Sequence, residues 1–163
     1  MRHTTWPVYL LCVVWIFGIW SPRMLSADPV SSATYAEALE MAELIASQNV
    51  QWSIYRAKGA SMGDYFGSHS LLLVKCSGIR EVQEGMIVLY RSSRGEVVAH
   101  KVLRHRGVWL ETAGVSNDRR DPVFVRANMV VGTVFGVIHA ASIPDGPLYT
   151  SDGRRLAVAY CKN

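Results

Sequence analysis

The sequence predicts a single, mostly-β domain that carries one amphipathic helix. Its 163 residues provide room for one domain of ordinary size. Half of the residues are hydrophobic and 18% are charged, so the chain can build a buried core and lacks the composition of a disordered protein. From about residue 50 onward, short apolar runs alternate with turn sequences, which is the pattern of closely spaced strands.

The N-terminal stretch predicts a signal or anchor segment over residues 1–27. Residues 6–20 form an apolar run of fifteen residues without a charge. A bilayer span takes about 20 apolar residues, so the run is short, but Trp6 and Trp20 stand where an aromatic belt would lie and favour an uncleaved anchor. Leu25-Ser26-Ala27 also suits a signal-peptide cleavage site. Both interpretations put the domain at 28–163 outside the cytoplasm, membrane-anchored in the first case and secreted in the second.

A helix is predicted over residues 35–47, after a small polar linker. Thr34 and Glu37 have the spacing of a capping box. The apolar residues that follow recur at helical spacing: Tyr35, Ala38, Leu39, Ala42 and Ile45. This apolar stripe is expected to cover a sheet, with the glutamates largely outside it.

Six strands are predicted after the helix, and the second of them is an apolar run expected to be covered on both faces. They lie at 49–55, 70–74, 86–91, 97–103, 108–112 and 129–139. Residues 92–95 are a turn sequence, so the third and fourth strands are expected to form a hairpin. No regular structure is predicted for 140–163, which contains two prolines and two glycines.

The charge of the chain argues against a nucleic-acid partner. The net charge is +4 and the pI is about 9.1, but the basic residues are spread along the chain and no basic run interleaves with aromatic residues. Weak attraction to the anionic headgroups of a lipid bilayer explains the same charge equally well.

The cysteines and histidines give no pattern of a metal or cofactor site. Cys12 lies in the apolar N-terminal run, which leaves Cys76 and Cys161 either as a disulfide pair of an exported chain or as two unpaired thiols. His100 and His105 are five residues apart, a spacing that no common zinc site uses.

A serine and a histidine are the first residues that suggest catalysis. Ser61 follows Gly59 and Ala60, two small residues that let the backbone approach another chain closely. Alternation along the predicted strand puts His100 on a face with valines and Lys101 on the opposite face. Taken alone, such a serine is usually a turn residue, and such a histidine is usually a satisfied core group.

A polar loop over residues 114–122 supplies two carboxylates, Asp118 and Asp121. Either carboxylate is a candidate to orient an imidazole. The alternative is a surface turn in which both carboxylates pair with the neighbouring Arg119 and Arg120.

In their order along the chain, these segments resemble type I signal peptidases over residues 55–139, about half of the sequence. The matching segments are Gly59-Ala60-Ser61-Met62 for the nucleophile motif, 84–91 and 98–103 for two strands, 112–115 for a loop, and 130–134 for the last strand. Each motif is weak by itself, and the shared order is the more specific signal.

The resemblance implies a signal-peptidase-like coiled β-sheet and a serine-type endopeptidase. Ser61 would be the nucleophile, and the base position holds His100, as in the endoplasmic-reticulum and archaeal branch of the family, in place of the lysine of the other branch. Free histidine titrates near ~6.5 and free lysine near ~10.4, so a histidine serves at neutral pH without a large shift. The orienting aspartate of that branch lies seven residues after the loop glycine, Gly114, which selects Asp121 and leaves Asp118 as the alternative acid.

The chain departs from the family pattern at several positions. The proline expected after the Ser-Met pair is missing, Met86 and Val115 replace aspartates, and Gly59 stands where some members carry a second oxyanion donor. The backbone N–H of Ser61 would then provide more of the hydrogen bonding that stabilises the oxyanion.

The function implied by the resemblance is cleavage of signal peptides from exported preproteins, after small residues and at the surface of the lipid bilayer. Two alternatives stay open: a specialised maturation protease of the same superfamily, such as a conjugation-associated enzyme, and a non-catalytic exported binding module on the same scaffold. A self-cleaving repressor relative fits less well, because the chain has an export segment and no pattern of a DNA-binding helix pair.

Overall fold

The computed structural model describes residues 31–161 of the chain. The predicted signal or anchor segment at 1–27 lies outside the described residues. Between residues 31 and 161, no helix is both long enough and apolar enough to cross a bilayer.

The described residues form one helix, eight strands and two short 3-10 turns, so the mostly-β prediction with one helix is confirmed. The helix is α1 (Tyr35–Ala46). The strands are β1 (Trp52–Gly59), β2 (Ser70–Lys75), β3 (Ile87–Arg91), β4 (Val97–His105), β5 (Trp109–Ala113), β6 (Val125–Arg126), β7 (Val130–His139) and β8 (Ala157–Cys161). The 3-10 turns are η1 (Ile79–Glu81) and η2 (Ala127–Met129).

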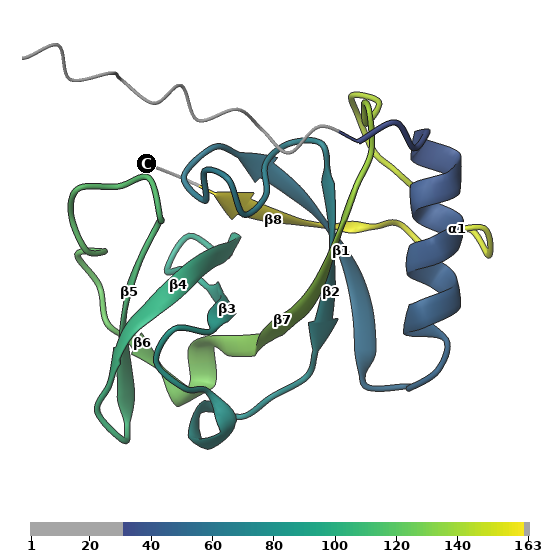
Figure 1. The fold of residues 1–163 in the computed structure, drawn as a ribbon. Coiled ribbons are helices and arrows are strands. Elements are labelled where there is room, and N and C mark those ends of the chain that lie inside the picture. Colours follow the sequence, from purple (N-terminus) through teal and green to yellow (C-terminus); the bar gives the residue numbers. More distant parts are fainter. Residues whose placement is uncertain (1–30, 162–163) are drawn as a thin grey trace, which may run out of the picture.

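The eight strands belong to one sheet in the order β3-β7-β2-β1-β8-β4-β5-β6. Because β3 also pairs with β4, six of the strands close into a barrel-like ring from which β5 and β6 extend (Figure 1). Neighbouring strands are antiparallel except at β8, which runs parallel to both β1 and β4. β8 is therefore the strand that joins β1 to β4 and completes the ring.

The inside of the ring is the main hydrophobic core. Its buried side chains come from β1, β2, β3, β4 and β8 and from the loop after β1: Ala57, Met62, Phe66, Leu72, Val74, Leu89, Ala99, Ala159 and Cys161. Partly buried valines of β7 pack against them. A separate cluster lies between β3, β4, β5 and β6, and it includes Val98 and Val102. The two faces of β4 thus belong to two different cores, as the alternation of its sequence predicts.

The N-terminus of α1 has the capping box that the sequence predicts. Thr34 Oγ1 accepts the N–H of Glu37 at 3.3 Å, and Glu37 Oε2 accepts the N–H of Thr34 at 2.7 Å. These two bonds satisfy backbone donors that a helix start otherwise leaves unpaired. The helix ends at Ala46, one residue before the predicted end.

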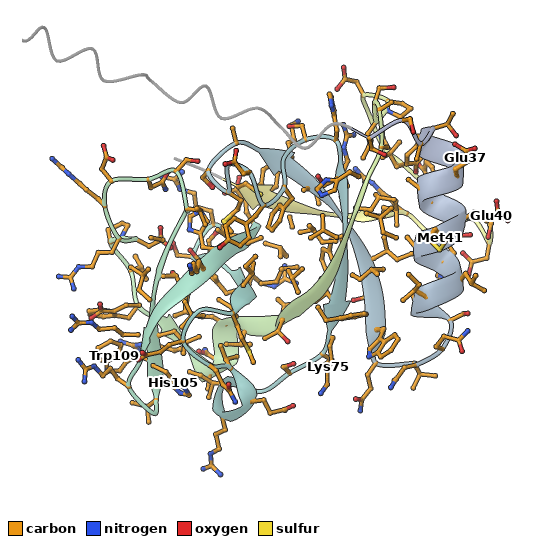
Figure 2. The ribbon with its side chains drawn as sticks, viewed as in Figure 1. Glu37, Glu40, Met41, Lys75, His105 and Trp109 are labelled. Carbon is orange, nitrogen blue, oxygen red and sulfur yellow. The ribbon has the colours of Figure 1, made fainter. Side chains whose placement is uncertain are left out.

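The helix packs on the outer face of the ring, against β1, β2 and β7. Ala38 and Ala42 are fully buried in this contact, beside Leu71 of β2. Figure 2 shows Glu40 on the side of the helix away from the sheet, and Met41 is half-exposed. The prediction that the apolar stripe covers a sheet is confirmed.

Two predictions about the strands are wrong. The first strand begins at Trp52 and not at Asn49, because Asn49 forms a turn: its side-chain oxygen accepts the N–H of Gln51 and its carbonyl accepts the N–H of Trp52. The stretch 140–163 is not wholly irregular, because Ala157–Cys161 form β8. The short β6 is absent from the prediction as well.

The cysteines of the described residues are unpaired. Cys76 is exposed and Cys161 is buried, and both are free thiols. The sequence left open a disulfide between Cys76 and Cys161 or two unpaired thiols, and the structure shows unpaired thiols.

Candidate active site

Ser61 lies in a turn directly after β1, at one end of the ring. The turn is closed by a hydrogen bond from the N–H of Gly63 to the carbonyl of Ala60, at 3.0 Å. Met62 points into the core of the ring and is fully buried, which fixes the backbone beside the serine. Ser61 is itself fully buried.

The structure brings Ser61, His100 and Asp121 together in one line. Ser61 Oγ lies 3.1 Å from His100 Nε2, and His100 Nδ1 lies 2.7 Å from Asp121 Oδ2. His100 is held on β4 opposite Val88 of β3 and is only 3% exposed. A hydroxyl, an imidazole and a carboxylate at these distances form the arrangement in which a serine is activated for nucleophilic attack.

Asp121 is held by three donors that meet at one oxygen. Its Oδ2 accepts hydrogen bonds from His100 Nδ1, from Thr112 Oγ1 at 2.5 Å and from the Tyr90 hydroxyl at 3.0 Å. Burial alone would raise the pKa of Asp121, but the bonds from His100, Thr112 and Tyr90 outweigh it and hold the pKa below its ordinary value. Asp121 is therefore ionised at neutral pH. Burial and the neighbouring Asp121 charge raise the pKa of Tyr90, so its hydroxyl keeps the proton that it donates.

The ionised carboxylate fixes the tautomer of the imidazole. An ionised Asp121 accepts hydrogen bonds and cannot donate them, so the hydrogen of the neutral His100 ring lies on Nδ1. His100 Nε2 then accepts a hydrogen bond from the Ser61 hydroxyl. This is the protonation state in which His100 acts as a general base toward Ser61.

The loop after β5 holds the backbone of the serine. Its Ser116 N–H donates to the Ser61 carbonyl at 2.8 Å. Gly114 packs so closely that a Cβ at this position would lie 2.7 Å from Ser61 Cβ and 2.8 Å from the Ser61 carbonyl oxygen. Glycine is therefore required at position 114 for Ser61 to keep its place.

We expect Gly114→Ala to lower the rate of any reaction at Ser61 by about 100-fold, since a shift of roughly 1 Å in a reacting group has an effect of that size. The matched control is Gly78→Ala, where the added methyl group meets no atom closer than 3.7 Å. Steady-state hydrolysis of one peptide by the two variants checks this, with thermal unfolding to show that both fold. Equal rates for the two variants would contradict the account of Gly114.

The other residues considered in the sequence have different surroundings. Asp118 is exposed on its turn, three residues before Asp121. Lys101 Nζ lies over the ring of Tyr65, 5.8 Å from its centre. Arg120 pairs with Glu111 of β5 at 3.4 Å, so its ion pair is not with an aspartate of its own loop.

Gly59 has no side chain, which lets the backbone of Cys161 approach it closely. Its N–H donates to Ser68 Oγ at 3.2 Å, so this donor is already used within the chain. Its φ of 114° lies in the left-handed region, which favours glycine. The Ser61 N–H donates to the carbonyl of Cys161 in β8, at 3.4 Å.

Tyr90 and Thr112 also belong to the site, although no pattern in the sequence marks them. Both lie on strands beside β4: Tyr90 of β3 pairs with Val98, and Thr112 of β5 pairs with Val102. Val98 and Val102 are the residues two before and two after His100, on its own face of the strand. The hairpin was predicted from the sequence, but the register that places Tyr90 beside Val98 comes from the structure.

A hollow of about 290 Å³ reaches His100 and Asp121 from the side of Tyr90 and Met129, and Ser61 is not among the residues that line it. A larger hollow, of about 700 Å³, lies between the end of α1, the start of β1 and the 150–157 segment, away from the serine. Ser61 therefore lines neither of these two hollows, and the smaller one reaches the imidazole and the carboxylate.

No protein-family model matches this chain, and no curated protein matches it.

Proposed function

We propose that this protein is a serine endopeptidase of the type I signal-peptidase kind, with Ser61 as nucleophile, His100 as general base and Asp121 as the orienting acid. The observation that carries the proposal is the buried hydrogen-bonded chain from Ser61 Oγ through His100 to Asp121, at 3.1 and 2.7 Å. Three groups far apart in the sequence meet with the geometry and protonation that nucleophilic catalysis requires.

The positions of the motifs also support this proposal, including the idea that the closed sheet is a signal-peptidase-like fold. The segments with family resemblance occupy the end of β1, then β3, β4, the end of β5 and the start of β7, in the expected order. Four of the five lie next to the site or on a strand that pairs with β4.

In the proposed reaction, Ser61 Oγ attacks the carbonyl carbon of a peptide bond while its proton passes to His100 Nε2. The ionised Asp121 stabilises the imidazolium that forms, and the Ser61 N–H faces the developing oxyanion. The C–N bond then breaks as Nε2 returns the proton to the leaving nitrogen, which leaves an ester on Ser61. A water molecule, deprotonated by the same imidazole, hydrolyses the ester and restores the enzyme.

The proposed substrates are exported preproteins with small residues at the first and third positions before the cleaved bond. The small residues Gly59 and Ala60, which directly precede the serine, support this preference. The apolar segment at 6–20 supports a location at a membrane surface, with the domain outside the cytoplasm.

The test is hydrolysis of a signal-type peptide by the purified full chain in detergent. A peptide with alanine at the first and third positions is expected to be cut at least about 10-fold faster than a matched peptide with phenylalanine at the first position, because a narrow site rejects the larger side chain. Ser61→Ala is the control and is expected to cut neither peptide. Equal cleavage by wild type and Ser61→Ala would disprove the proposal.

A further inference from the structure

A basic hollow lies on the outer face of the ring, against β1 and β8. Ala57 of β1 points into the core of the ring, so its neighbours Arg56 and Lys58 point outward. These two residues line a hollow of about 250 Å³ together with Arg155 and the loop that follows β7. Among the described residues around it, three carry a positive charge and only Asp145 carries a negative one. The hollow therefore has an excess of positive charge.

Arg56 is the unusual residue of this hollow, because its charge is buried. The residue is only 7% exposed. Its Nη1 donates to the carbonyl of Gly146 at 3.1 Å, and its Nη2 lies 3.8 Å from Asp145 Oδ1. The side chain of Asp145 is fully exposed, so water screens this ion pair and makes it weak. The buried guanidinium therefore lacks a buried counter-charge among the described residues.

One donor of the same guanidinium has no partner. Arg56 Nε is buried, and none of the described residues accepts a hydrogen bond from it. A buried donor without an acceptor costs stability, and so does a buried charge without a close counter-ion. In a folded protein, such a group indicates a functional role or an ion bound beside it. An anion in the hollow that Arg56 lines would supply the missing counter-charge.

Lys58 and Arg155 bring two further positive charges to the hollow. Both residues are exposed, and neither has an ion-pair partner within residues 31–161. An arginine fork aligns two N–H groups with two oxygens of one anion, and a lysine ammonium adds a point charge, which is a combination that suits phosphate. Val158 and Tyr160 of β8 line the same hollow and give it apolar surface beside the charges.

We propose that this hollow binds a phosphate group, with Arg56 as the buried anchor and with Lys58 and Arg155 at its rim. Three cations exceed what one carboxylate needs, whereas a phosphate monoester carries a charge of about −1.5 to −2 at neutral pH. A soluble phosphate and the headgroup of a phospholipid share this chemistry. The site does not depend on the proposed function, because none of the three proposed catalytic residues lines the hollow.

The experiment is isothermal titration calorimetry of the full chain in a neutral detergent with sodium phosphate, against sodium chloride at equal ionic strength to correct for screening. The wild type is expected to bind phosphate with a Kd of about 1 mM or tighter, the affinity that roughly two charge-assisted hydrogen bonds provide. Lys58→Ala and Arg155→Ala are each expected to weaken binding by about 10-fold, because each loses one such bond. The matched control is Arg106→Ala, which removes an exposed arginine from the turn between β4 and β5 and is expected to bind like the wild type.

Arg56→Met separates a ligand anchor from a residue that only supports the loop. Methionine keeps a flexible apolar side chain and removes the charge. The variant is expected to lose phosphate binding, and its unfolding temperature in chloride is expected to equal or exceed that of the wild type, because an uncompensated buried charge has been removed. Phosphate binding by Arg56→Met at the wild-type affinity would overturn the proposal. If the variant does not fold, the exposed Lys58→Ala and Arg155→Ala still decide the question.

A second titration distinguishes a lipid headgroup from a soluble phosphate. It uses micelles of the same detergent that contain phosphatidic acid or, for comparison, phosphatidylcholine, whose phosphate is capped by choline. Half-saturation at a lower concentration of phosphatidic acid than of inorganic phosphate assigns the site to a lipid, and the reverse assigns it to a soluble phosphate. Both results support the proposal. It is wrong if the wild type shows no binding up to about 10 mM phosphate, roughly ten times the expected Kd, or if Lys58→Ala and Arg155→Ala bind as tightly as the wild type.

Discussion

Replacing His100 by alanine is expected to lower kcat/KM for an alanine-containing signal-type peptide by about 10³-fold, the effect typical of losing a general base. His100 Nε2 is 3.1 Å from Ser61 Oγ, and the imidazole has its own hydrogen-bonded support from Asp121, so no other described group is placed to take the serine proton. The measurement is steady-state hydrolysis with thermal unfolding in parallel, since His100 is also a buried residue.

The matched control is Lys101→Ala on the same strand. A lysine base is the alternative that the signal-peptidase resemblance raises, and Lys101 is the lysine next to the base position. Its ammonium lies over the Tyr65 ring, so Lys101→Ala is expected to keep its rate within about 2-fold, as for loss of a cation–π contact. A loss of activity in Lys101→Ala together with an active His100→Ala would reverse the assignment of the base.

Asp121→Asn is expected to lower kcat/KM by about 10²- to 10⁴-fold while changing the size of the side chain very little. The oxygen that accepts from His100, Thr112 and Tyr90 would be replaced or rotated, and an amide nitrogen facing the ring would favour the tautomer with its hydrogen on Nε2. That hydrogen would point at Ser61 and block proton transfer. Activity is measured as for His100→Ala.

Asp118→Asn is the control that decides between the two carboxylates of the loop. Asp118 is exposed, three residues from Asp121, and the exchange removes the same charge from the same loop. Its rate is expected to equal that of the wild type within experimental error. If Asp118→Asn were the inactive variant and Asp121→Asn the active one, the hydrogen-bonded chain described above would not be the catalytic one.

Much of the fold could be predicted because several strands contain short apolar runs. β2 is buried along five of its six residues, β3 begins with three aliphatic residues, and five of the ten residues of β7 are aliphatic. β1 extends further than predicted because it contains Arg56 and Lys58, which do not look like strand interior. Arg56 is nonetheless buried, since its guanidinium donates to the carbonyl of Gly146 at 3.1 Å and lies 3.8 Å from Asp145.

β8 could not be predicted, because its contribution to the core comes from small residues. Ala159 and Cys161 give a weak hydrophobic signal, and the arginines before them suggest a surface segment. What buries them is pairing with β1 and β4, which are far away in the sequence. Local sequence patterns carry no information about such partners.

Some residues of the site could be predicted from local sequence motifs, and others depend on contacts between distant segments. Ser61, His100 and Asp121 could be proposed because their order along the chain matches a known pattern. Tyr90 and Thr112 could not, because their role depends on strand register and on the path of the loop that returns Asp121 to β4. The burial of Ser61 also depends on a distant segment, β8, and so lies beyond any argument from the residues around it.

The parallel pairing of β8 has a consequence for how the protein is made. β1 and β8 join residues about one hundred positions apart, so their contact is among the slowest to form as the chain folds. Because the chain is made N-terminus first, β1 to β7 are available before residues 157–161 and can pair with one another first. The serine and histidine can then meet before the gap between β1 and β4 is filled. Folding then includes a stage in which the gap between β1 and β4 is open, and the pairing of β8 with both strands closes it.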